Sequence, residues 1–298
     1  MMSLGPIRTA LFVPGNRVDR FPKALASGAD KVIVDLEDAV PIAAKESARE
    51  GLAKFLSTGA DPRIIVRVNS VDTPYFEDDI ERILAVAPVN FLIPKVESSE
   101  GLRLVNRALL QVENDKSIGA GTIKIFAQIE TAKAVDAVSQ IVQTQTDPDR
   151  LITVAFGAAD YSADLGIEMT ADGTELLYPR SRLAVACRAA GLEPPLDTPF
   201  MIDLKDLNAL ERDALSARQL GFQGKLCIHP NQVELVNRVF SPSSENVNYA
   251  RRVVAAFDAA EATGQGVLLV DGKFVDYPVV TRARRVLEIA ASIEAGSE

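Results

Sequence analysis

Short apolar runs recur along the chain, and each is followed by polar or charged residues. Eight of these runs have the pattern expected of parallel strands that are buried on both faces. The predicted strands cover residues 9–13, 31–36, 63–68, 90–96, 123–129, 151–156, 197–202 and 224–228, and the seventh has the weakest pattern.

Stretches with the period of an amphipathic helix lie between these runs, at residues 46–56, 75–85, 100–113 and 204–221. Eight strands that alternate with helices over about 230 residues predict a parallel (β/α)8 TIM barrel, an α/β fold, rather than an open doubly wound sheet. The sequence has no GxGxxG or Walker-type motif, which weakens the open-sheet alternative further.

The chain continues well beyond the eighth predicted strand. Residues 244–264 have a helical pattern and fit the last helix of the barrel. VLLVDGKFV places an Asp-Gly pair between alternating apolar residues, which predicts a hairpin, and residues 276–295 predict a final amphipathic helix. We therefore predict a barrel domain over residues 6–240 and a C-terminal helix-hairpin-helix extension over residues 241–298. The apolar residues of this extension need burial, so we expect it to pack on a neighbouring subunit.

The composition restricts the classes of partner. The formal net charge of -9 argues against a nucleic-acid partner, because phosphate binding needs a basic surface. The sequence has no apolar run near the roughly 20 residues of a membrane span, and its start lacks a signal-peptide layout, so we expect a cytoplasmic protein without a membrane role. Two cysteines and one histidine are too few for a disulfide framework or a zinc cluster. A metal would therefore be held by oxygen atoms, which favours magnesium or manganese.

Two predicted strands end at a carboxylate. Glu130 follows the strand at 123–129, and Asp160 lies 30 residues further on, about one strand-helix unit of a repeating β/α fold. The carboxyl ends of barrel strands meet at the functional face, so these two side chains could share a divalent cation. In the alternative interpretation, Glu130 caps the next helix and Asp160 is an ordinary loop residue.

Charged residues also follow the other predicted strands, where they would be costly to bury without partners. They are Arg17 and Lys23 after the first strand, Asp35, Glu37 and Asp38 at the second, Arg67 at the third, Lys95 at the fourth, and Lys225 with His229 at the eighth. Either they bind a ligand or they form a network of ion pairs that closes the barrel mouth. Arg17, Lys23 and Lys225 suit phosphate groups, with solvated surface as the alternative, and His229 reads as a structural residue because no carboxylate beside it would orient its ring.

Eight motifs in order, LFVPGN, DLEDAV, RVN, PKVES, IET, FGAADYSADLG, GFQGKLCIHPNQ and VDGKFVDYPVV, resemble those of the citrate lyase beta subunit-like proteins. These proteins belong with malyl-CoA and citramalyl-CoA lyases in the HpcH/HpaI aldolase group. The resemblance covers nearly the whole chain. It implies a magnesium-dependent TIM barrel, usually a homotrimer, that breaks or makes a carbon-carbon bond in a 3-hydroxyacyl thioester.

The resemblance also implies roles for single residues. Glu130 and Asp160 match the metal ligands, Arg67 matches the residue that holds the substrate carboxylate and carbonyl, and Asp276 matches a base donated by the C-terminal segment. The family often carries an acid where Ala159 stands. We expect the contacts with the substrate and with CoA to come from Arg17, Lys23, Asp35, Glu37, Asp38 and Lys225.

The expected activity is that of a carbon-carbon lyase acting on malyl-CoA or citramalyl-CoA and releasing acetyl-CoA and a 2-oxo acid. One alternative is an acyl-CoA thioesterase or malate synthase-like activity on the same site. Another is a subunit that works only in a citrate lyase complex with an acyl carrier partner.

Overall fold

The computed structural model describes residues 5–296, which divide into two compact units. One unit is Ile7–Asn237, and the other contains the described residues from 238 onward together with residues 5 and 6. The predicted domain boundary at residue 240 lies three residues beyond this division. The packing of the second unit on a neighbouring subunit stays a prediction.

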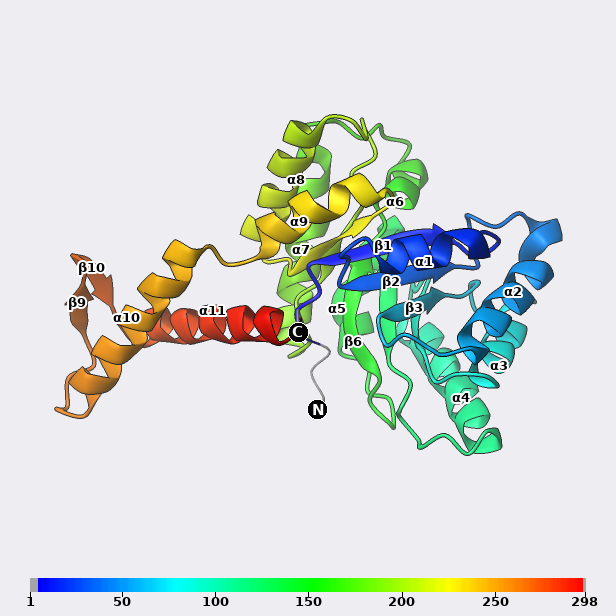
Figure 1. Cartoon of the computed structure of the whole chain (residues 1–298), viewed down its shortest axis with the longest axis horizontal. Coiled ribbons are helices and arrows are strands. Elements are labelled where there is room, and N and C mark those ends of the chain that lie inside the picture. Colours follow the sequence, from blue (N-terminus) through cyan, green and yellow to red (C-terminus); the bar gives the residue numbers. More distant parts are fainter. Residues whose placement is uncertain (1–4, 297–298) are drawn as a thin grey trace. The chain divides into compact units, whose positions relative to one another are not determined.

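The first unit is a closed barrel of eight parallel strands, each paired with its neighbours in chain order (Figure 1). The strands are β1 (Thr9–Pro14), β2 (Lys31–Asp35), β3 (Ile64–Arg67), β4 (Asn90–Ile93), β5 (Ile125–Ile129), β6 (Leu151–Phe156), β7 (Leu196–Asp197) and β8 (Gly224–Cys227). Every residue of β3, β5 and β8 is buried, as expected for strands with a packed interior on one side and helices on the other. The predicted TIM barrel is confirmed.

Helices alternate with the strands and cover the outside of the barrel. They are α1 (Phe21–Leu25), α2 (Lys45–Ser57), α3 (Phe76–Leu84), α4 (Ser99–Asp115), α5 (Ala132–Val142), α6 (Ala158–Leu165), α7 (Leu177–Ala189), α8 (Leu207–Gln219) and α9 (Val233–Phe240). Ser98, Thr131 and Asp206 cap α4, α5 and α8, because each side chain accepts a hydrogen bond from a backbone N–H of the first turn.

Two predicted elements were wrong. The seventh strand ends at Asp197, and the residues from Thr198 to Met201 leave the sheet, because Pro199 has no N–H to donate and the Thr198 hydroxyl accepts a hydrogen bond from the Ala158 N–H. The helix that follows β8 is α9, whereas the segment predicted as the last barrel helix belongs to the second unit.

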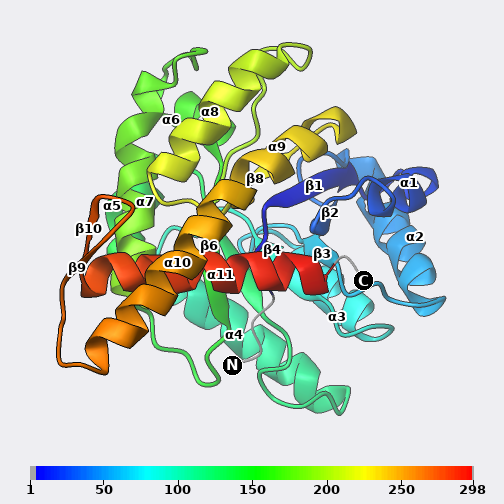
Figure 2. The same cartoon turned by 60° about the vertical axis from the view of Figure 1, so that its left-hand side comes forward.

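The second unit is a helix-hairpin-helix. It contains α10 (Ser244–Glu261), the antiparallel strands β9 (Leu268–Val270) and β10 (Lys273–Val275), and α11 (Tyr277–Ala295), with α10 and α11 packed across each other (Figure 2). Asp271 and Gly272 both have positive φ, 51° and 75°, as a tight hairpin turn requires. Val253, Phe257 and Val275 form its small core.

No helix in the described part of the chain combines the length and the apolar character that a membrane crossing requires. Cys187 and Cys227 are buried free thiols.

Candidate active site

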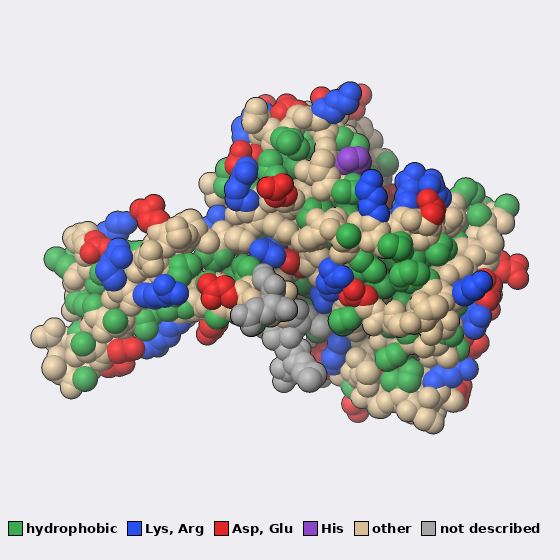
Figure 3. Space-filling model, viewed as in Figure 1, with side chains coloured by type: hydrophobic (Ala, Val, Ile, Leu, Met, Phe, Trp, Pro, Cys, Tyr) green, Lys and Arg blue, Asp and Glu red, His purple; other side chains and the backbone are tan. Residues whose placement is uncertain are grey.

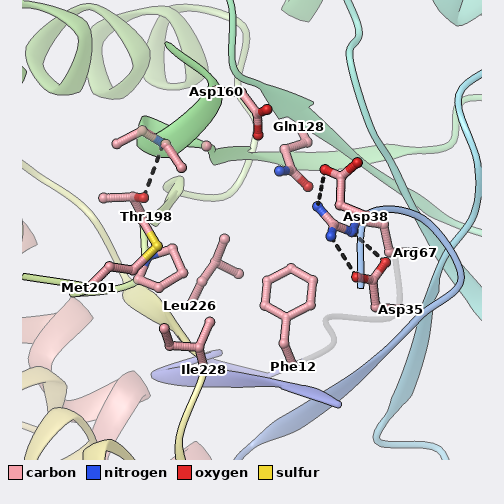
Figure 4. Close-up of a pocket in the computed structure, with 14 residues that line it drawn as sticks. Phe12, Asp35, Asp38, Arg67, Gln128, Asp160, Thr198, Met201, Leu226 and Ile228 are labelled. Atoms are coloured by element: carbon pink, nitrogen blue, oxygen red, sulfur yellow. Dashed lines mark hydrogen bonds and ion pairs between the residues drawn. The ribbon is translucent and has the colours of Figure 1, made fainter. Parts of the chain in front are cut away.

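A pocket of about 230 Å³ lies at the carboxyl ends of the barrel strands (Figure 4). Side chains from five strands or from the loops just after them line it: Phe12, Asp35, Asp38, Arg67, Gln128, Leu226 and Ile228. Gly157, Ala158, Ala159 and Asp160 complete it after β6, and Thr198, Pro199 and Met201 complete it after β7. The barrel therefore brings residues from distant parts of the sequence to its functional face.

Glu130 lies at the end of β5 and is 0% exposed. Its Oε1 accepts a hydrogen bond of 2.7 Å from the backbone N–H of Lys95, and the Gln128 amide donates to its Oε2. Burial raises the pKa of Glu130 to about 8, and the negative charges of Glu37 and Asp160 add to the rise. The Glu130 carboxyl therefore resists ionisation unless a cation lies beside it.

Two backbone features give Glu130 its place. Lys95 has a φ of 52°, in the left-handed region, and this conformation accompanies the hydrogen bond from its N–H to Glu130. Gly157 leaves the space that Glu130 fills, since a Cβ at position 157 would lie 2.6 Å from Glu130 Oε2.

Asp160 enters the pocket from the first turn of α6. No described residue forms a hydrogen bond or an ion pair with its carboxylate. The buried Oε1 of Gln128, which also lines the pocket, has no hydrogen-bond partner among the described residues. A pocket with an unpaired carboxylate and an unpaired buried acceptor is short of positive charge and of donors.

These observations test whether a divalent cation fits. The donors are oxygen atoms only, which suits magnesium or manganese. The described residues contain no group of three or more His, Cys, Asp or Glu arranged to hold a metal, so the protein would supply the two carboxylates of Glu130 and Asp160. Magnesium commonly binds through one or two carboxylates and completes its shell with water and substrate oxygens, so the residues present fit the ion.

Arg67 lies at the end of β3, on the same side of the pocket as Asp160 and Gln128 (Figure 4). Its Nε and Nη2 donate to the two oxygens of Asp35 at 2.7 and 2.6 Å, and its Nη1 lies 3.3 Å from Glu37 Oε2. The guanidinium stacks on the Phe12 ring at 4.8 Å from its centre. Burial opposes the charge, but the hydrogen bonds and the charge of Asp35 raise the pKa of Arg67. Asp35 thus occupies the Nε and Nη2 edge of the guanidinium, and a ligand that binds Nη1 would share it with Glu37.

The acidic residues predicted at the second strand are Asp35, Glu37 and Asp38. Asp35 orients Arg67, and it also accepts hydrogen bonds from the backbone N–H groups of Glu37 and Ala39. Burial raises the pKa of Glu37, although Arg67 and Lys95 oppose the rise, and Glu37 Oε1 lies 2.9 Å from Lys95 Nζ. Asp38 is half exposed and lines the pocket. In this structure Asp35 therefore binds Arg67, and Glu37 pairs with Arg67 and Lys95.

The three predicted phosphate-binding cations lie in different environments. Lys23 is exposed on α1, and Arg17 is partly exposed and paired with Asp19 at 2.8 Å. Lys225 corrects the expectation, since it is 0% exposed and its Nζ pairs with Asp197 and Asp213 between the barrel wall and α8. Side chains alternate along β8, so Leu226 faces the pocket and Lys225 faces the helices, out of reach of a phosphate.

Two other candidates cap helices in this structure. His229 is at the surface (Figure 3), where its ring caps a short 3₁₀ helix by accepting from the Asn231 N–H. Asp276 belongs to the second unit and caps α11 by accepting from the Val279 N–H at 3.2 Å. The role of Asp276 as a base stays a prediction.

Sequence reasoning missed three contributors. Gln128 precedes Glu130 by two residues, and strand alternation places both on the same side, a signal that was available. Phe12 supports Arg67, but its run looks like any buried strand. Met201 lines the pocket from a segment that was predicted to be a strand.

Comparison with known proteins matches residues 8–230 to the HpcH/HpaI aldolase/citrate lyase family. The chain is 37% identical over 285 residues to the citrate lyase subunit beta of Leuconostoc mesenteroides subsp. cremoris, covering 95% of this chain and 93% of that protein. It is 35% identical over 292 residues to the (3S)-malyl-CoA thioesterase of Cereibacter sphaeroides, covering 97% of this chain and 96% of that protein.

A solved structure is also similar. CitE from Mycobacterium tuberculosis, crystallised with magnesium, acetoacetate and coenzyme A, has a TM-score of 0.76 and 32% identity and covers 96% of this chain and 98% of its own. The family match spans the barrel and the pocket at its mouth, and the similar proteins span nearly the full length. The chain therefore belongs to the HpcH/HpaI aldolase/citrate lyase family.

Proposed function

We propose that this protein is a magnesium-dependent carbon-carbon lyase that cleaves or forms a 3-hydroxyacyl-CoA thioester such as malyl-CoA or citramalyl-CoA. The observation that carries the proposal is the presence of Glu130, the Asp160 carboxylate without a hydrogen-bond partner, and Arg67 at one pocket in the barrel mouth. Membership of an aldolase and citrate lyase family supports it, as does the similar CitE structure that contains magnesium and coenzyme A.

Glu130 and Asp160 would hold the cation, and manganese would fit the same oxygen ligands. The bound ion supplies Lewis-acid stabilisation of negative charge on the oxygens of the 2-oxo acid. Lys95 and Gln128 orient Glu130 through its two oxygens, so its carboxylate is held ready before substrate arrives.

The cleaved bond joins the hydroxyl-bearing carbon to the methylene carbon next to the thioester. The hydroxyl group gives up its proton to solvent water and becomes the carbonyl of the 2-oxo acid, while the electron pair of the broken bond forms the enolate of the acetyl thioester. The enolate then takes up a proton on its methylene carbon and becomes acetyl-CoA. In the proposal, Arg67 binds the substrate through its Nη1 side, and Asp276 exchanges the proton at the methylene carbon.

The remaining predicted residues would bind the rest of the thioester. Arg17 and Lys23 are exposed on the segment that follows β1, where cations can meet the phosphates of CoA. Asp38 is exposed at the pocket and can contact the substrate. We also propose that the chain assembles as a homotrimer and acts in the cytoplasm.

Two alternative functions have specific support. A thioesterase or malate synthase-like activity would add water to the thioester at the same site, and the similarity to a (3S)-malyl-CoA thioesterase favours it. A non-autonomous subunit would need an acyl carrier partner, and the similarity to a citrate lyase subunit beta favours that reading.

The experiment is a screen of the purified protein with malyl-, citramalyl- and citryl-CoA, with magnesium or with EDTA. The proposal expects acetyl-CoA and a 2-oxo acid in equal amounts, with magnesium only. Free CoA without a 2-oxo acid would indicate the thioesterase. Turnover that appears only with an acyl carrier thioester would indicate the complex-bound subunit.

A further inference from the structure

The pocket has two chemically different sides. Asp160, Gln128, Arg67 and Asp35 lie on one side, and an apolar wall lies across from them (Figure 4). This wall consists of Met201, Leu226 and Ile228, whereas Phe12 lies next to Arg67 and stacks on its guanidinium. The polar side contains the proposed cation site and Arg67. The wall therefore faces the part of the ligand that those groups do not bind.

The charge of the lining is unbalanced. Among the residues that line the pocket in the described part of the chain, the acidic ones are Asp35, Asp38 and Asp160, and Arg67 is the only Lys or Arg. Arg67 already contacts Asp35 and Glu37. A second carboxylate placed against the apolar wall would meet no cation of the lining and would lose part of its hydration.

The size of the pocket indicates which part of the substrate it receives. About 230 Å³ is below the roughly 300–1,000 Å³ of sites that bind drug-sized ligands. It suits the acid part of the thioester, whereas the nucleotide of CoA must lie outside. The candidate acids differ in one substituent on the carbon next to the carboxylate: hydrogen in malyl-CoA, methyl in citramalyl-CoA and carboxymethyl in citryl-CoA.

We infer that the wall of Met201, Leu226 and Ile228 selects a 2-oxo acid with a small uncharged alkyl substituent and rejects one with a second carboxylate. This inference rests on the proposed function and names its substrate class. Citramalyl-CoA is then the preferred substrate of the three, because a methyl group gains contact with the wall that hydrogen lacks. An apolar pocket discriminates one such group by about 10- to 200-fold.

The first test is binding to the magnesium-loaded protein by calorimetry, which does not require turnover. The probes are glyoxylate, pyruvate, 4-methyl-2-oxopentanoate and freshly prepared oxaloacetate. The last two have equal numbers of non-hydrogen atoms, so they separate charge from size. We expect pyruvate to bind at least tenfold more tightly than oxaloacetate and 4-methyl-2-oxopentanoate to bind more tightly than oxaloacetate. Equal or tighter binding of oxaloacetate would overturn the inference.

The second test moves a cation into the wall. Met201→Lys changes a partly exposed loop residue, and Ile228→Lys changes a second exposed position if the first variant folds poorly. Either variant should raise the affinity for oxaloacetate relative to pyruvate by at least tenfold, whereas the control Met201→Leu should keep the wild-type order. An unchanged ratio in both lysine variants would contradict the inference.

The kinetic counterpart is the ratio of kcat/KM for citramalyl-CoA and citryl-CoA. If citryl-CoA is cleaved best, the inference fails and the proposed lyase stands. If none of the three thioesters is cleaved, the proposed lyase fails, and the binding order still decides the role of the wall.

Discussion

At the scale of single residues, the chemistry of the site depends on which groups bind the three nitrogens of the Arg67 guanidinium. Two of its nitrogens hold Asp35, and the third faces Glu37 and the pocket. Arg67→Lys keeps the charge but cannot bind Asp35 through two hydrogen bonds and also meet a substrate carboxylate. We expect kcat/KM to fall on the order of 100-fold or more, measured with the preferred thioester.

The matched control is Arg63→Lys. Arg63 also binds a carboxylate through two nitrogens, Asp61 at 3.0 and 2.7 Å, but it lies before β3, at the end of the barrel opposite the pocket. This control should retain wild-type kcat/KM. Nearly full activity of Arg67→Lys would show that Arg67 is a structural ion-pair residue.

The polar residues of the site differ in how far the sequence reveals them. Glu130, Asp160 and Arg67 could be predicted because each interrupts or follows an apolar run at a strand end. The backbone contact of Lys95 could not be predicted, because a positive φ at a lysine leaves no trace in the residue pattern. The occupation of Arg67 by Asp35 was equally hidden, since the sequence places both at the barrel mouth without saying which charges pair.

At the scale of elements, a buried cluster of charged side chains lies between the strands β7 and β8 and the helices α7 and α8. Arg180 and Lys225 pair there with Asp197 and Asp213. Lys225→Met would leave negative charge uncompensated, so we expect the free energy of unfolding to fall by about 3–5 kcal/mol, with KM for the thioester unchanged in the folded protein. Urea denaturation measures the first quantity and steady-state kinetics the second.

The comparison variant is Lys23→Met, at an exposed position on α1. Here the stability should stay the same, and KM for the thioester should rise if Lys23 binds a CoA phosphate. A higher KM in Lys225→Met with unchanged stability would restore the original expectation for Lys225.

The two thiols give an independent check on folding for every variant. Burial raises the pKa of Cys187 to about 11 and that of Cys227 to about 12, so both stay protonated at neutral pH in the folded protein. A thiol reagent at pH 8 should therefore react slowly with a folded variant and rapidly after denaturation.

Elements with strong periodicity were predictable, and elements at transitions were not. The patterns of β1 to β6 and β8 reflect burial on both faces, which the residues themselves dictate. The run from Asp197 to Ile202 has the weakest strand pattern of the eight, and Pro199 and the hydrogen bond of Thr198 with α6 take it out of the sheet, so Met201 lines the pocket. The sequence prediction placed Lys225 at the pocket. Side chains alternate along β8, however, so Leu226 faces the pocket and Lys225 faces the helices.

At the scale of the whole molecule, the second unit has an exposed apolar hairpin region. The hairpin region of that unit exposes Leu269, Phe274 and Tyr277 at 70%, 60% and 57%, and apolar side chains so exposed favour burial against another surface. We predict that Asp276 serves the active site of a neighbouring subunit.

Co-expression of Arg67→Ala with Asp276→Asn tests this prediction. Asn keeps an oxygen for the hydrogen bond that caps α11, so the second variant should fold. With random assembly about one quarter of the sites combine an intact barrel with an intact Asp276, and activity should recover to about that share. Mixed assemblies that stay as inactive as the single variants would place Asp276 in its own subunit or outside catalysis.

The fold of the barrel and of the second unit could be predicted from the sequence, whereas the assembly of the chain stays a prediction. Burial patterns act within one chain and appear in its residues, whereas the placement of a small unit with an exposed apolar hairpin depends on surfaces that no local pattern describes.

The central claim is that Glu130 and Asp160 together hold the divalent cation, and metal titration tests it most directly. Calorimetry with magnesium, repeated by spin resonance with manganese, should show a single class of site in the wild type. Glu130→Gln and Asp160→Asn should each weaken binding by about 100-fold or more, because each removes a charged ligand from an oxygen-only site. The control Asp164→Asn, a carboxylate on the same helix that accepts from the Ala132 N–H, should bind metal as the wild type does. Wild-type metal affinity in both Glu130→Gln and Asp160→Asn would contradict the account and move the site to Asp35, Glu37 and Asp38.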